Sequence, residues 1–180
     1  QRAIHTVEKN LLEGALIVIF ILVLFLGNLR AGLIVATAIP LSLLFALGMM
    51  NLFGVSANLM SLGAIDFGII VDGSVIVVEA VMHHLAIRKN HQRLTQTQMD
   101  EEVFHSASKI RSSAAFGEII ILMVYIPILT LVGVEGKMFR PMAQTVVFAI
   151  LGALILSLTY IPAMSALLLP KTVSDKRSFA

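Results

Sequence analysis

Five long apolar segments dominate the sequence, and they are the feature that most limits how the chain can fold. Each reaches the roughly 20 residues that an α-helix needs to cross the hydrocarbon core of a bilayer. The residue-by-residue alternation of a membrane β-barrel is absent, so helices are the expected spanning elements. The apolar segments cover residues 11–29, 31–50, 56–82, 112–134 and 141–169.

The amino-acid composition is typical of an integral membrane protein. Hydrophobic residues make up 58% of the 180 residues and charged residues only 13%, whereas a soluble domain has roughly 25% charged residues. The expected fold class is therefore an all-α integral membrane protein, a polytopic bundle of five transmembrane helices. With no cysteine in the chain, disulfides and thiolate metal sites are excluded. Because the chain starts at Gln1 with no signal-peptide pattern, we expect an excerpt of a longer protein.

The distribution of Lys and Arg predicts which side of the membrane each connection faces. Nine of the 13 basic residues fall in the turn 27–32, the link 83–111 and the C-terminal tail. The positive-inside rule makes that side cytoplasmic, so the N-terminus enters from outside. Because these charges gather at segment ends, we interpret them as topology signals and not as a nucleic-acid surface.

The connections between segments carry their own predictions. Polar and glycine residues in 51–58 indicate a turn, and 135–140 is expected to join the last two segments. The second half of the link, about 98–110, has the pattern of a short amphipathic helix lying along the membrane surface. Prolines inside the segments are expected to mark kinks, and they are Pro40, Pro127 and Pro162.

Three acidic residues interrupt the third apolar segment: Asp66, Asp72 and Glu79. An Asp at the centre of a membrane helix costs about 2.5–3.5 kcal/mol, whereas each Leu, Ile, Val or Phe returns about 0.3–0.6 kcal/mol. Three acids therefore cancel most of the apolar gain of this segment, which should insert only beside neighbours that shield them. Ionisable residues inside a membrane helix indicate function by default.

The spacing of these acids separates their directions. At about 100° per residue, Asp72 and Glu79 lie within roughly 20° of each other and about 10 Å apart along the axis, while Asp66 is rotated from Asp72 by about 120°. Gly68 and Gly73 permit close approach of another helix near Asp72. Because burial and neighbouring charges set the protonation of a carboxyl group, such a site can take up and release protons, as a proton-driven pump requires.

Two other interpretations of the acids stay open. They can fix helix packing through hydrogen bonds alone, or bind a hard cation through their oxygens. A soft-metal cage is a poor fit, because no His precedes His83 in this segment. Asp66 also opens the tripeptide Asp-Phe-Gly of protein kinases, but the glycine-rich and catalytic loops of a kinase are missing.

Ionisable residues outside the third segment carry weaker functional signals. Glu118, near the start of segment 112–134, is expected to have an interfacial or packing role, with a supporting role in a proton path as the alternative. The histidines in or beside the link are expected to be solvated and not to bind metal, although imidazole is a common ligand. They are His83, His84, His91 and His105.

The third apolar segment and its flanking stretches resemble a known protein family. The stretch DFGIIVDGSVIVVE closely resembles the fourth transmembrane helix of heavy-metal efflux pumps of the resistance–nodulation–division (RND) superfamily, and is most like the cobalt–zinc–cadmium pumps. The flanking stretches EKNLLEGALIVIFILVLFLGNLRAG and VYIPILTLVGVEGKMFRPMAQ agree. The resemblance covers nearly the whole chain. It implies helices two to six of a pump with twelve transmembrane helices and large external domains.

The resemblance also implies a function. Such a pump is a proton antiporter and not an enzyme, needs no cofactor, and exports divalent cations of the cobalt, zinc and cadmium type across the bacterial inner membrane. It works as a homotrimer with a periplasmic adaptor and an outer-membrane channel, and has no nucleic-acid partner. Asp66, Asp72 and Glu79 match the family's proton relay, whose partner Lys belongs to a later helix outside this chain. The metal ligands are unknown.

Three alternatives to this function are kept. Pumps of the copper–silver type usually carry an apolar residue at the position of Asp66. Exporters of drugs or organic solutes usually carry two adjacent acids, whereas here the acids are six and seven residues apart. A non-transporting membrane scaffold would tolerate neutralisation of all three. One departure from the family is Ala80, where an Asn commonly follows the Glu.

Overall fold

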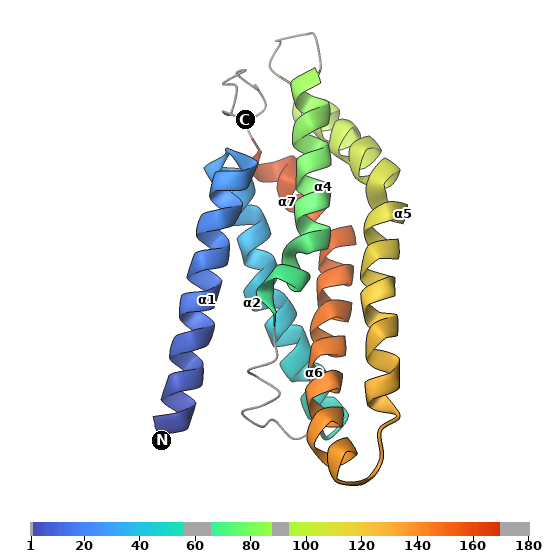
Figure 1. The fold of residues 1–180 in the computed structure, drawn as a ribbon. Coiled ribbons are helices and arrows are strands. Elements are labelled where there is room, and N and C mark those ends of the chain that lie inside the picture. Colours follow the sequence, from blue (N-terminus) through green and yellow to red (C-terminus); the bar gives the residue numbers. More distant parts are fainter. Residues whose placement is uncertain (1, 56–65, 88–93, 170–180) are drawn as a thin grey trace.

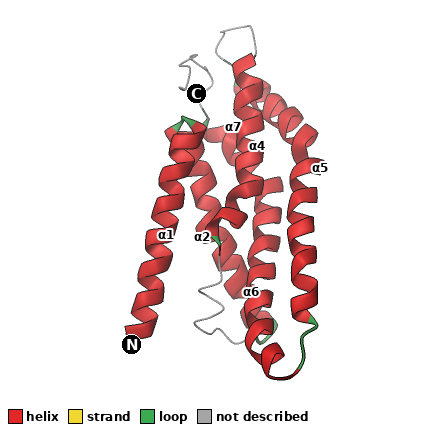
Figure 2. Ribbon diagram, in the orientation of Figure 1, coloured by secondary structure: helices red, strands yellow, loops and turns green. Residues whose placement is uncertain are grey.

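The computed structural model describes residues 2–55, 66–87 and 94–169, and all regular structure in these ranges is helical (Figure 2). Five of the described helices are long and apolar enough to cross a membrane. This confirms the expected fold class, a polytopic bundle of membrane helices. The helices are α1 (Arg2–Leu26), α2 (Leu29–Leu52), α4 (Phe67–Ile87), α5 (Gln96–Leu129), α6 (Gly133–Leu158) and α7 (Tyr160–Leu168).

The long helices run alternately up and down the bundle (Figure 1). The turn between α1 and α2, the end of α4, the start of α5 and the short helix α7 all lie at one end. The start of α1 and the turn between α5 and α6 lie at the opposite end. This arrangement puts the turn 27–32 and the start of α5 on the same side, as the distribution of basic residues requires.

The centre of the bundle is formed by α2, α4 and α6. Helix α2 packs against α1, α4, α6 and α7, and α6 also contacts α4 and α5. Helices α1 and α5 lie at the outside and expose large apolar side chains, as surfaces that meet lipid or further apolar helices do. The exposed residues include Leu12, Phe20, Phe25, Phe116, Met123 and Ile126, and the buried core includes Ile34, Val35, Val77, Val78 and Ile150.

The tight turn between α1 and α2 is built from two residues with complementary roles. Gly27 has a φ of 59°, a left-handed conformation that glycine adopts without steric cost. Asn28 then caps α2, because its side-chain oxygen accepts hydrogen bonds from the backbone N–H groups of Arg30 (3.0 Å) and Ala31 (3.4 Å). These bonds satisfy donors that the first turn of a helix leaves unpaired.

Removing this cap is expected to destabilise the α1–α2 turn. Replacing Asn28 by Ala deletes both hydrogen bonds and should cost about 0.5–2 kcal/mol of stability, whereas Ser keeps an acceptor at the same position. The midpoint of thermal unfolding in detergent, measured on the full-length pump that contains this segment, checks the prediction. Equal midpoints for the Ala and Ser variants would contradict it.

Helix α5 differs from the expectation for the link 83–111. A separate surface helix over about 98–110 and a span over 112–134 were expected, but α5 runs unbroken from Gln96 to Leu129. Its start is set by Thr95, whose side chain accepts from the backbone of Gln98 while the Gln98 side chain accepts from the backbone of Thr95. This capping box fixes the helix start. The helix continues through Pro127, and its C-cap is Thr130.

The last two segments also begin and end at different residues than expected. Residues 135–140 are not a turn but part of α6, which begins at Gly133 with a φ of 75°. The expected segment 141–169 is divided between α6 and α7, with the break at Thr159. Pro162 explains the break, because it cannot donate a hydrogen bond to the carbonyl of Leu158 and its ring would clash with that carbonyl.

The first three segments agree more closely with their helices. The expected ranges 11–29 and 31–50 correspond to α1, which starts earlier and ends at Leu26, and to α2. Of the expected range 56–82, residues 56–65 lie outside the described part of the chain. The described part begins at Asp66, and α4 continues past 82 to Ile87. Of the three acids, Asp66 thus lies immediately before α4, Asp72 in its first half and Glu79 just past its middle.

Candidate proton-relay site

Asp66 lies immediately before the first residue of α4 and caps it. Its Oδ1 accepts a hydrogen bond of 2.8 Å from the backbone N–H of Gly68, and its backbone carbonyl accepts from Ile70. A carboxylate is favoured here, because the N-terminal end of a helix carries a partial positive charge and unpaired N–H donors. The structure therefore gives Asp66 a structural contact that the sequence analysis did not anticipate.

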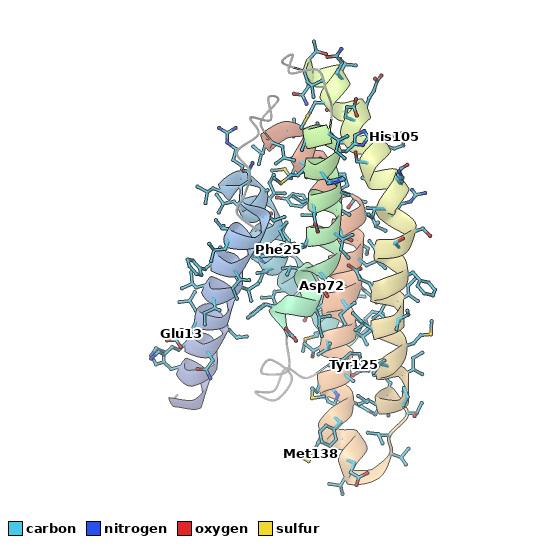
Figure 3. All side chains as sticks on the ribbon, turned by 45° about the horizontal axis from the view of Figure 1, so that its top comes forward. Glu13, Phe25, Asp72, His105, Tyr125 and Met138 are labelled. Carbon is cyan, nitrogen blue, oxygen red and sulfur yellow. The ribbon has the colours of Figure 1, made fainter. Side chains whose placement is uncertain are left out.

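Asp72 lies in the first half of α4, and its side chain is exposed on the surface of this helix. Figure 3 places it near the middle of the bundle, between Met138 toward one end and His105 toward the other. The residues on either side of Asp72, Val71 and Gly73, are buried in the helix packing.

Glu79 lies two helical turns beyond Asp72 and is also exposed. Together with His83, His84 and Lys109 it lines a cavity of about 560 Å³ between α4 and α5. The spacing of seven residues puts Glu79 and Asp72 on one face of α4. Of the three acids, Asp72 and Glu79 thus share one face of α4, and Glu79 reaches the cavity at the end where α5 begins.

The histidines at that end join α4 to α5. Nε2 of His84 lies 2.8 Å from Oε2 of Glu102, and the ring centroids of His84 and His105 are 5.6 Å apart. All three described histidines of this region are exposed, as expected, and His91 lies outside the described residues. Within the described ranges, no group of three or more His, Asp or Glu side chains could hold a metal ion.

Glu118 was expected to have an interfacial or packing role, with a supporting role in a proton path as the alternative. The structure excludes the interfacial position, because Glu118 is buried, with 2% of its surface exposed, and lies against Gly73 of α4. A Cβ at Gly73 would overlap Oε1 of Glu118 and would lie 3.3 Å from Oγ of Ser157 on α6. The glycine next to Asp72 was the available signal, since a missing side chain makes room for a neighbour.

The fold is that of a membrane-helix bundle with acidic residues along one helix, and comparison with known proteins identifies its family. The model of the AcrB/AcrD/AcrF family matches residues 1–180, and the chain belongs to that family. It is 55% identical over 180 residues to the cobalt-zinc-cadmium resistance protein CzcA of Cupriavidus metallidurans. It is also 49% identical over 174 residues to the nickel and cobalt resistance protein CnrA of the same organism. These findings confirm the resemblance to heavy-metal RND pumps.

The alignments cover nearly all of this chain but a small part of each relative. The two relatives align over 98% and 96% of this chain, and the chain spans only 17% and 16% of their lengths. The crystal structure of a heavy metal efflux pump is similar with a TM-score of 0.75 and 44% identity, over 92% of this chain and 16% of that one. The chain is thus similar to one membrane-embedded part of much longer proteins.

Proposed function

We propose that this chain is the proton-handling membrane part of a pump that exports divalent heavy-metal cations. The cargo is inferred from similarity to relatives named for cobalt, zinc, cadmium and nickel resistance. The pump is a secondary transporter and not an enzyme, is located in the bacterial inner membrane, and acts as a homotrimer. Its partners are a periplasmic adaptor and an outer-membrane channel, and its substrates are the cation and protons.

The observation that carries the proposal is the position of Asp72 midway along the bundle on an apolar helix. A carboxylate at membrane depth is costly and marks an ion or proton pathway. Asp66 on one side and Glu79 on the other, next to the cavity between α4 and α5, extend the acids along the same helix. We assign proton transfer to Asp72 first, with Asp66 and Glu79 as the neighbouring relay positions.

Proton binding drives the pump by changing the charge at Asp72. The charged form requires polar or cationic neighbours, whereas the neutral form can contact apolar surface. Because the two forms favour different surroundings, proton uptake from outside shifts the helices between two arrangements, and release inside restores the first. We propose that proton transfer on α4 is coupled to cation movement through this change of helix arrangement.

Reconstitution of the full-length pump tests this function. In proteoliposomes, an imposed pH gradient should drive zinc, cobalt or cadmium movement, recorded by a trapped metal indicator, with a matching proton flux in the opposite direction. A protonophore should stop the metal movement, because it removes the driving gradient. Monovalent copper and an organic dye serve as alternative cargoes. Metal transport that is equally fast without the pH gradient would contradict the proposal.

A further inference from the structure

Glu118 is a buried acid whose carboxyl oxygens have no hydrogen-bond partner. Among the described residues it is the only ionisable side chain with less than a tenth of its surface exposed, and neither Oε1 nor Oε2 has a hydrogen-bond partner. A carboxylate in this position would be an unpaired buried charge, which costs several kcal/mol, whereas a protonated carboxyl group is neutral. A packing role alone does not explain a carboxyl group here, because a leucine would fill the space without burying any unpaired polar atom.

The location of Glu118 links it to the acids of α4. Its carboxyl group occupies the space that a side chain at Gly73 would take, and Gly73 directly follows Asp72. Helix α6 completes the contact through Ser157, whose hydroxyl donates to the carbonyl of Leu154 at 2.9 Å. Three helices therefore meet at the Glu118 carboxyl group, beside the acid to which we assign proton transfer.

The charges around Glu118 are acidic. On α4 the acid beside the contact is Asp72, which directly precedes Gly73, and the nearby group on α6 is the neutral Ser157. In the described part of the chain, no Lys, Arg or His forms an ion pair with Glu118. Two close carboxyl groups without a cation disfavour the state in which both are charged, so the protonation of one depends on the other.

We propose that Glu118 is a second proton-carrying residue of the relay and exchanges a proton with Asp72. In the exchange, one O–H bond breaks at the Asp72 carboxyl group and one forms at the Glu118 carboxylate, so the negative charge moves from α5 to α4. Since neither oxygen of Glu118 is hydrogen-bonded in this structure, the transfer passes through one water molecule or a rotation of a carboxyl group. This inference rests on the proposed proton-driven function.

The test replaces Glu118 by Gln in the full-length pump. Glutamine has the same size but cannot release a proton, so proton-coupled metal flux in proteoliposomes should fall roughly tenfold or more. Its pH profile should also change shape, which a purely structural role would not cause. In infrared difference spectra across a pH step, E118Q should lack one carboxyl band. E101Q, a change at an exposed Glu on the same helix, is the matched control and should behave like the parent pump.

The outcomes separate this inference from the proposed function. If E118Q keeps the parent flux and pH profile while Asp72→Asn is inactive, Glu118 carries no proton and the inference is overturned, although the relay on α4 stands. Full activity of the Asp72 variant would instead overturn the proposed function itself. If E118Q fails to assemble, Glu118→Asp retains a carboxyl group and should shift both the carboxyl band and the pH profile. An unchanged band and profile in that variant would overturn the inference.

Discussion

Replacing Asp72 by Asn in the full-length pump is expected to abolish proton-driven metal transport. Asparagine has nearly the same shape but remains neutral, so it can neither bind nor release a proton in the middle of the bundle. Loss of an essential proton-transfer group lowers rates by roughly 100-fold or more. The flux of zinc or cobalt into proteoliposomes under an imposed pH gradient is the direct measurement, and the metal tolerance of cells that express the variant is the second.

The control for this prediction is Asp100→Asn. Asp100 is exposed near the start of α5, and its Oδ1 accepts a hydrogen bond of 2.9 Å from Gln96, which an asparagine oxygen can also accept. This variant should transport metal at the parent rate. Both variants should insert and form the same oligomer, which size-exclusion chromatography checks. Parent-like transport by the Asp72 variant would remove Asp72 from the relay.

The second large effect is expected for stability, at the contact between α1 and α2. Gly32 is buried, and a Cβ there would lie 2.6 Å from Cγ2 and 2.9 Å from Cα of Val23. Because one of these atoms belongs to the backbone, α1 must move to admit even a methyl group. Gly32→Ala should therefore destabilise the pump by about 1–3 kcal/mol, the usual cost of overpacking.

Gly48→Ala provides the matched control on the same helix. A Cβ at Gly48 would meet no heavy atom within 4 Å, and alanine favours a helix over glycine. This variant should unfold at the same temperature as the parent or higher, while Gly32→Ala should unfold at a lower one. Thermal unfolding in detergent, followed by intrinsic fluorescence or aggregation, measures both. A Gly32 variant as stable as the Gly48 variant would show that the α1–α2 contact is looser than described.

The membrane-spanning character of the chain could be predicted because it depends on length and composition alone. Apolar runs of about 20 residues specify membrane helices wherever they occur, so the five spans are predictable without knowledge of the packing. Helix ends were harder, because they depend on single residues in context. Thr95 starts α5 well before its apolar part, and Pro162 separates α7 from α6.

The arrangement of the candidate site was predictable only for residues that lie on the same helix. The shared face of Asp72 and Glu79 follows from their separation by seven residues. The burial of Glu118 depends on how α5 packs against α4 and α6, which no local pattern encodes. The contact of Asp66 with Gly68 could not be predicted either, because it depends on where α4 begins. The apolar sequence continues on both sides of that point and does not mark the start of the helix.

The unbroken length of α5 has a mechanical consequence. A helix of 34 residues is about 50 Å long, well beyond the roughly 30 Å of hydrocarbon that it must cross. Measured along the helix, Glu118 lies about 33 Å from the first turn of α5. A small rotation of α5 about Glu118 would therefore displace the beginning of this helix much more than the residues that surround the buried acid.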